Sequence, residues 1–476
     1  MNADEINRFF NAFYRLDHED YSFNPYLRIS KATESKMKLY NFSVLDKLIY
    51  QIILLKITLP LVLIIRILFN SLLNTLRFII YHKSKKTLEK TDVLFLSHLT
   101  LRNLSSQEDS FYGPLPDALK KSNKKIGVIY TNQTRRLSKF KMKENDLTNN
   151  LVIPKYLNLQ ELIKYFIIAT KSIQFSLNEV KTHSLLNSNE RMLISKACFS
   201  FLRLETMMNF HLIEITKKTI VDCQPSYVFI TFEGHIYENS IYLNCKNNPV
   251  VRQIFMFQNS PIGPSQYGLF DFIKRKGEKL TYLVQGIAYK KLIVETNNAS
   301  RVLVIGRKEE KFVEIVPNRK IENPKLLLVP DGDKFNITCH LNLTKYFYDN
   351  ISSEIVISLH PDTRIGLYNK IKLLSLMRKG FIKQVVSNLN LEKIAEYDLL
   401  VYTSSNIAMR SLLLEKSLIY VSNSNYNLDP LWLIKDRNKN FARKRKSKLN
   451  IEKYPKNKYY ELYSEINYKP LYNLIS

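Results

Sequence analysis

The chain has 476 residues, of which 45% are hydrophobic and 24% are charged. This composition excludes a wholly disordered chain, and the length predicts two to four domains. The net charge of +28 favours anionic partners, namely nucleic acid, anionic lipid or phosphorylated substrates. The wealth of Asn, Ile and Tyr with only 11 Gly is typical of an A/T-rich genome, which raises Lys everywhere, so charge alone does not identify a partner.

Four cysteines, none in a C-x-x-C pair, indicate neither a disulfide scaffold nor a zinc site. The N-terminus has no apolar signal core, which predicts a reduced cytosolic protein. We expect no metal and no cofactor.

Residues 48–81 form the most apolar stretch of the chain. On a helical projection, Lys56, Arg66, Asn70, Asn74 and Arg77 share one narrow polar stripe on an otherwise apolar surface. This pattern favours a helix lying in the plane of a membrane interface, and the basic run 81–86 would attract anionic lipid. A transmembrane span and a helix packed against the protein itself remain alternatives. Residues 1–90 are therefore predicted to be a helical, membrane-associating extension.

Short apolar runs that alternate with helical stretches predict parallel, doubly wound sheets. The expected strands of the first sheet are 91–97, 126–130, the run ending at 232, 251–257 and 281–284. Helices are expected at 114–122, 158–180, 189–218, 236–246 and 286–295. These elements predict a first Rossmann-like domain over 91–298.

The alternation restarts near residue 300, which predicts a second Rossmann-like domain over 299–425. Its expected strands are 301–306, 325–330, 354–359, 383–386, 397–403 and 417–421, with helices at 336–349, 366–379, 391–395 and 405–415. Residues 426–476 are predicted to be a solvated, partly helical basic tail. The fold class is thus α/β, with two doubly wound parallel sheets facing a cleft.

Ligands of such sheets bind at the carboxyl ends of the strands. In the first domain, Glu233 follows a strand directly, and His235 and Glu238 begin the next helix. A carboxylate and an imidazole here could deprotonate an acceptor hydroxyl, whereas helix capping is the structural alternative. Gln258 and Asn259 follow the next strand in a polar loop that is predicted to face the cleft. Like Glu238, they are expected on the side where the molecule that carries this hydroxyl would bind.

Polar residues also follow three strands of the second domain, namely Asp331, then His360, Pro361 and Arg364, then Ser404, Ser405 and Asn406. Hydroxyls at a helix start can bind phosphate, although Ser is also a common N-cap. Together with His360 and Arg364, they predict a site for a nucleotide phosphate. The Gly-rich motifs of P-loop and dinucleotide-binding proteins are absent from the sequence.

Five segments carry a resemblance: TFEGHIYEN (231–239), QNSP (258–261), LLLVPDG (326–332), SLHP (358–361) and YTSSNIAMRSLLLEKSLIYV (402–421). In their order and spacing the chain resembles the GT-B class of glycosyltransferases over about residues 90–425. More closely, it is similar to bacterial surface-carbohydrate biosynthesis proteins related to Kdo transferases and to sialyltransferases that use CMP-sugars.

The resemblance implies a nucleotide-sugar donor in the second domain. There His360 and Pro361 match the His-Pro motif at the donor phosphate, and Ser404 and Ser405 match its serine pair. Glu233 matches the acidic residue that faces the acceptor. The sequence departs from the pattern at Asp331, where a Glu-Gly pair is usual, and at Asn259, where many relatives have His.

We therefore expect a glycosyltransferase that moves a sugar, Kdo or sialic-acid-like, from a CMP-linked donor to a lipid-linked surface glycan, in lipopolysaccharide or capsule synthesis. It would lie on the inner face of the cytoplasmic membrane, bound to anionic lipid. The alternatives are a CDP-polyol phosphotransferase and a non-catalytic GT-B-like protein of glycan assembly. Nucleic-acid binding ranks last, because only charge supports it.

Overall fold

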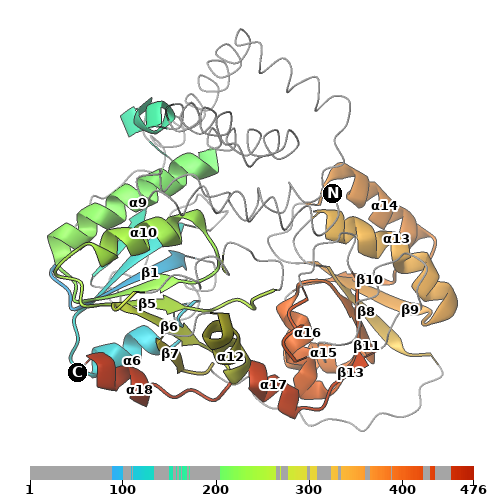
Figure 1. Ribbon diagram of the computed structural model, residues 1–476. Helices are drawn as coiled ribbons and strands as arrows, with labels where there is room; N and C mark the ends of the chain where they lie inside the picture. The colour runs from blue at the N-terminus through green and yellow to red at the C-terminus, as the bar shows by residue number, and fades with distance from the viewer. Residues whose placement is uncertain are drawn as a thin grey trace, which may run out of the picture.

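The structure is a computed structural model (Figure 1). It describes residues 88–99, 109, 111–132, 149–153, 157, 160–161, 163–168, 171, 204–263, 269, 277–296, 301–307, 323–330, 334–359, 365–387, 389–421, 429–434 and 452–475. Of the predicted extension 1–90, residues 1–87, which include the amphipathic segment 48–81, lie outside the described residues. Among the described helices, none has the length and apolarity needed to cross a membrane.

The first lobe is built on a seven-stranded sheet of order β3-β2-β1-β4-β5-β6-β7, in which every described pairing is parallel. Its strands are β1 (Val93–Leu99), β2 (Ile126–Asn132), β3 (Asn150–Ile153), β4 (Tyr227–Thr231), β5 (Gln253–Phe257), β6 (Leu280–Val284) and β7 (Arg301–Val304). All seven residues of β1 are buried, as expected for a parallel strand covered on both faces.

Helices cover both faces of this sheet (Figure 1). One face packs on α6 (Leu115–Lys121) and α18 (Lys469–Ile475), and the other on α9 (Leu204–Cys223), α10 (Ile236–Lys246) and α12 (Ile287–Thr296). Alternate residues of each strand enter the two cores. Leu94 and Leu96 lie on the α9–α10 side, and Val93 and Phe95 on the α6–α18 side.

The second lobe has a six-stranded sheet of order β10-β9-β8-β11-β12-β13, in which only β13 is antiparallel. Its strands are β8 (Lys325–Val329), β9 (Glu354–Ser358), β10 (Gln384–Val386), β11 (Leu399–Tyr402), β12 (Ser417–Tyr420) and β13 (Glu452–Lys453). Its helices are α13 (Lys334–Asn350), α14 (Leu367–Arg378), α15 (Leu391–Ala395), α16 (Asn406–Ser411), the 3-10 helix Leu412–Leu414 and α17 (Asn457–Leu462). The predicted class, α/β with two doubly wound parallel sheets, is confirmed.

One predicted strand belongs to the other sheet. The run 301–306 was expected to open the second domain, but β7 pairs with β6, with Thr281 opposite Arg301. The first lobe therefore extends to residue 307, and the second sheet begins with β8. Strand β3 was not predicted.

The C-terminal segment differs from the expected solvated tail. Residues 452–475 pack on both lobes: β13 pairs with β12, and α18 buries Leu471 and Ile475 in the core of the first lobe. Between the lobes, α17 packs on α12 and on the 3-10 helix, and Tyr463 donates a hydrogen bond to Met409 Sδ at 3.1 Å.

Two glycines let this segment approach the first lobe. A Cβ on Gly286 would lie 2.1 Å from the carbonyl oxygen of Leu462, and one on Gly306 would lie 2.0 Å from that of Glu465. Gly306 also has φ +74°, a conformation that other residues rarely adopt. The crossing of the C-terminal backbone over β7 therefore requires glycine at this position.

Candidate active site

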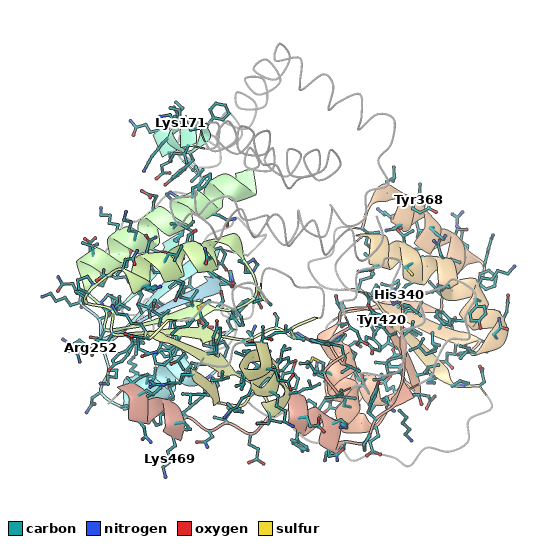
Figure 2. All side chains as sticks on the ribbon, viewed as in Figure 1. Lys171, Arg252, His340, Tyr368, Tyr420 and Lys469 are labelled. Carbon is teal, nitrogen blue, oxygen red and sulfur yellow. The ribbon has the colours of Figure 1, made fainter. Side chains whose placement is uncertain are left out.

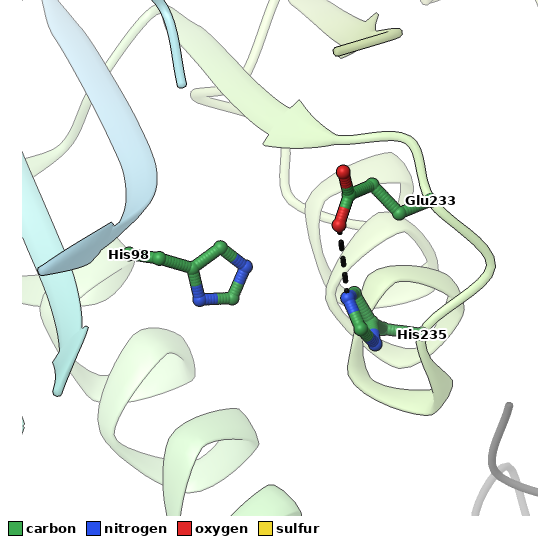
Figure 3. Close-up of side chains that lie close together, drawn as sticks. All are labelled: His98, Glu233 and His235. Atoms are coloured by element: carbon green, nitrogen blue, oxygen red, sulfur yellow. Dashed lines mark hydrogen bonds and ion pairs between the residues drawn. The ribbon is translucent and has the colours of Figure 1, made fainter. Parts of the chain in front are cut away.

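The candidate site lies where the strand order of the first sheet reverses. β1 and β4 are neighbours, although β2 and β3 follow β1 in sequence, so the connections diverge at this pair of strands. Ligands of doubly wound sheets bind at the carboxyl ends of such strands. His98 lies at the end of β1, and Glu233 and His235 follow β4 (Figure 3).

Glu238 holds the turn after β4 in place. Its buried carboxylate accepts the backbone N–H groups of Glu233 (3.0 and 3.1 Å), Gly234 (2.8 Å) and His235 (2.9 Å), and the Thr231 hydroxyl (2.9 Å). Gly234 has φ +82°, which allows the tight turn. Glu238 therefore has the capping role considered as the alternative, and it positions its neighbours instead of facing an acceptor.

The same environment shifts the acidity of Glu238. Burial raises the pKa of this carboxyl to about 7, while the nearby His235, the Glu233 N–H and the Thr231 hydroxyl favour the carboxylate. A carboxylate can accept all of these hydrogen bonds, whereas a protonated acid would oppose one of them with its own O–H.

Glu233 and His235 form a hydrogen-bonded pair. His235 Nε2 lies 3.2 Å from Glu233 Oε2, and the hydroxyl of Ser260 donates to Glu233 Oε1 (Figure 3 shows the pair). The side chain of Glu233 is 10% exposed and that of His235 is 33% exposed, so the pair is reachable from one side. The His235 ring stacks on Tyr237, with centroids 5.2 Å apart and planes at 12°.

The loop after β5 supplies Ser260. Gln258, predicted to face an acceptor, is fully buried: its Nε2 donates to the carbonyl of Ser260 at 2.8 Å, and its Oε1 accepts the N–H of Gln285 at 3.0 Å. Gln258 therefore shapes the loop that brings Ser260 to Glu233. Asn259 is half-buried in the same loop.

His98 completes the site from β1. Thr131 donates its hydroxyl proton to the carbonyl of Ser97 at 3.4 Å, so it accepts the His98 Nδ1 proton. Nε2 of His98 then accepts from the hydroxyl of Tyr237 at 2.9 Å. Burial, followed by the charge of His235, lowers the pKa of His98 to about 4, although Glu233 acts in the opposite direction. His98 is therefore a neutral imidazole at physiological pH.

The three side chains of Figure 3 are also donors that a divalent transition metal accepts. One atom from each of His98, Glu233 and His235 lies within 4.8 Å of the other two. Ligands at about 2.1 Å from a tetrahedral zinc lie about 3.4 Å apart. These side chains have protein partners in Thr131, Tyr237 and Ser260. The arrangement is a hydrogen-bonded acid–base cluster that would have to rearrange to hold a metal.

The second sheet has its own reversal between β8 and β11, and the predicted serine pair follows β11. Ser404 and Ser405 are half-buried and Asn406 is exposed. Ser405 caps α16, its Oγ accepting the N–H of Ile407 at 3.2 Å. A serine hydroxyl that accepts one hydrogen bond can still donate its proton to a phosphate oxygen.

The remaining predicted residues, Asp331, His360, Pro361 and Arg364, lie outside the described residues. Conversely, sequence reasoning missed His98 and Ser260. The signal for His98 was present, because it directly follows the predicted strand 91–97. Ser260 lies in the loop that was singled out for Gln258 and Asn259.

No protein-family description and no curated protein matches the sequence. Among solved structures, the chain is similar to S. aureus MnaA with UDP, at 10% identity and a TM-score of 0.40, over 74% of this chain and 89% of that one. It is similar to apo OtsA, at 8% identity and a TM-score of 0.38, over 70% and 85%. It is also similar to the apo lipopolysaccharide outer core galactosyltransferase WaaB, at 11% identity and a TM-score of 0.33, over 69% and 80%. At such low identities and TM-scores, these likenesses assign no activity.

Proposed function

We propose that the protein is a glycosyltransferase with Glu233 as its catalytic base. The supporting observation is the hydrogen-bonded pair of Glu233 and His235 at the strand reversal of the first sheet. His235 and Ser260 hold the two carboxylate oxygens, so the carboxylate is oriented before a substrate binds. General bases of this kind typically contribute about 10²–10⁴-fold to rate.

In the proposed reaction, an acceptor hydroxyl binds beside Glu233. Its oxygen attacks the anomeric carbon of the donor sugar while its proton passes to Glu233. The new bond from carbon to the acceptor oxygen forms as the bond from carbon to the phosphate oxygen breaks, and the nucleotide leaves. His235 would stabilise the Glu233 carboxylate before the transfer.

We assign the donor to the second lobe. The hydroxyls of Ser404 and Ser405 follow β11 at the second strand reversal, and the sequence resemblance adds His360 and Pro361 on the donor phosphate. Arg364 joins them because it follows the same predicted strand as His360, and Asp331, which follows another predicted strand, is a further catalytic candidate. Binding a phosphate next to its leaving bond would stabilise the charge that develops there.

The motifs further favour a CMP-linked Kdo or sialic-acid-like sugar and a lipid-linked surface glycan as acceptor. Such an acceptor would place the enzyme on the inner face of the cytoplasmic membrane. This choice of sugar, nucleotide and acceptor rests on the order of the sequence motifs.

Thermal unfolding with CMP, CDP, UDP and GDP tests the proposal first, because a ligand of the native state raises the unfolding temperature with concentration. We expect a shift with CMP that is reduced by His360→Ala and by the double Ser404→Ala, Ser405→Ala change. A shift with CDP alone, with a phosphodiester product, would favour a polyol phosphotransferase. No shift with any nucleotide, and no transfer, would favour a non-catalytic protein.

A further inference from the structure

Helix α14 of the second lobe carries an apolar stripe on its outer surface. Leu367, Tyr368, Ile371 and Leu374 are 76%, 65%, 60% and 52% exposed. Residues at these spacings share one side of a helix. Figure 2 shows Tyr368 at the outer edge of the second lobe.

The opposite side of α14 is already occupied. Asn369 and Leu373 are 3% and 7% exposed. Asn369 Oδ1 accepts the hydroxyl of Thr338 on α13 at 2.8 Å, and Leu373 belongs to the core of the second lobe. Leu376 and Met377 also pack against that core, so the helix carries apolar side chains both toward the lobe and away from it, which an ordinary surface helix does not.

The exposed hydrophobic side chains of the described residues are concentrated on this stripe. Of the 13 large hydrophobic side chains that are exposed in the described residues, four lie on this one helix of 12 residues. Single exposed apolar residues are normal, whereas a contiguous patch marks an interaction site.

Cations flank the stripe. At about 100° per residue, Lys370 and Lys372 lie about 100° to either side of Ile371, and Arg378 ends the helix. Residues 365–386 contain five Lys or Arg and no Asp or Glu. The Lys372 ammonium lies 5.9 Å from the centroid of the Tyr368 ring and donates a hydrogen bond to Asn342 Oδ1 on α13, whereas Lys370 is exposed. Long cationic side chains beside an apolar surface can reach outward to anionic headgroups while their stems cover the apolar boundary.

We propose that α14 docks the second lobe on an anionic membrane surface, with Leu367, Ile371 and Leu374 entering the boundary between headgroups and acyl chains. The positive charge beside the stripe favours a membrane over a second copy of the chain. Two copies would bring their flanking Lys and Arg side chains close together, whereas anionic lipid neutralises this charge. The proposal deepens the membrane location suggested above by giving it a described surface. Vesicle binding tests the docking of α14 without any transfer reaction, so the docking proposal and the glycosyltransferase proposal can fail separately.

The first experiment compares full-length variants in co-sedimentation with phosphatidylcholine vesicles with and without about 30% phosphatidylglycerol. We expect Leu367→Gln, Ile371→Gln and Leu374→Gln together to weaken binding to the anionic vesicles by about tenfold or more. The matched control is Val221→Gln, Ile287→Gln and Val294→Gln, three exposed apolar residues of α9 and α12, which should bind as the wild type does. Equal binding by the two triple variants would overturn the proposal. It would also be overturned if the wild type is a dimer and the triple variant of α14 is a monomer that binds vesicles as well as the wild type does.

A local probe separates α14 from any other membrane-binding segment. The described cysteines, Cys223, Cys245 and Cys339, are buried, so a full-length protein with Cys198→Ser can be labelled at Ile371→Cys with an environment-sensitive dye. We expect a blue shift with anionic vesicles at this position and none with the label at Val221→Cys. An unchanged spectrum at Ile371→Cys on vesicle-bound protein would show that α14 does not contact lipid.

Discussion

Nε2 of His235 lies 3.2 Å from Oε2 of Glu233, so one hydrogen bond ties the imidazole to the carboxylate that we propose as the base. The two residues are only two positions apart, and the backbone between them is held by the carboxylate of Glu238. The geometry of the pair therefore depends on a turn that a different, buried side chain maintains.

Glu233→Gln should reduce sugar transfer by about 10²–10⁴-fold, because the amide cannot accept the acceptor's proton. Nucleotide binding should persist, since the donor is assigned to the other lobe. Steady-state transfer and thermal shift with nucleotide measure the two effects. Glu214→Gln, at an exposed ion pair with Lys164, is the matched control and should leave both unchanged. Loss of nucleotide binding in Glu233→Gln would move this residue to the donor site.

Glu238→Gln should lower both stability and activity. The amide offers one acceptor oxygen and directs an NH₂ group toward backbone N–H donors that the carboxylate now satisfies. Leaving such donors unpaired costs about 1–3 kcal/mol, which urea unfolding can measure. Activity at a temperature where the variant stays folded should also fall, because the turn no longer holds Glu233 and His235. Full activity and stability would show that the turn does not need this carboxylate.

The pH dependence of stability should show the buried His340. Burial lowers its pKa from 6.5 to about 4, against opposing hydrogen bonds. Between these values the unfolded chain binds more protons than the native protein, so native stability falls as the pH drops. The loss attributable to His340 from pH 7 to pH 5 is about 2 kcal/mol. Urea unfolding of His340→Gln at both pH values should show a smaller loss than the wild type. Identical losses would mean that His340 titrates normally in the native state.

Gly306→Ala should release the C-terminal crossing. Its Cβ would lie 2.0 Å from the carbonyl oxygen of Glu465, in addition to the cost of φ +74°. Gly380 has nearly the same φ, +75°, and nothing within 4 Å of an added Cβ, so Gly380→Ala isolates the backbone cost, about 1–2 kcal/mol. We expect Gly306→Ala to lose clearly more in urea unfolding and to become sensitive to proteolysis near residue 465. Equal losses would show that the crossing adjusts freely.

Chelation should leave transfer unchanged, because His98, Glu233 and His235 already have protein partners. Excess Zn²⁺ should inhibit transfer by competing for the same donors, and His98→Gln should weaken this inhibition. Assays with EDTA and with added Zn²⁺ check both statements. Loss of activity in EDTA with recovery on adding metal would make this cluster a metal centre.

Local pattern predicted most of the elements but not their assembly. Parallel strands buried on both faces are continuous apolar runs, and therefore β1, β4 and β8 are visible in the sequence. Alternation does not say which sheet a strand joins. The run at residue 301 was therefore assigned to the second domain, although its partner is β6. In the C-terminal segment, Leu471 and Ile475 are buried among Lys and Tyr residues whose composition indicated a tail.

The candidate site was predictable as far as the rule of strand ends was applied. That rule found Glu233 and His235, and it would have found His98 after the first strand. It could not separate residues that face a ligand from residues that build the turn, because Glu238 and Gln258 have the same sequence context as their neighbours. Their roles depend on hydrogen bonds to backbone groups. Glu238 accepts N–H groups of the turn just before it, and Gln258 accepts the N–H of Gln285, which lies far away in the chain.

The return of the C-terminal segment to the first lobe means that the described elements of the two lobes are joined at two places along the chain, between β7 and β8 and through residues 452–468. Two bodies joined at a single point can swivel about any axis, whereas two separate connections resist twisting and leave opening about the line between them as the easiest motion. Residues 452–475 thus restrict how the lobes can move relative to one another without contributing a side chain to the proposed chemistry.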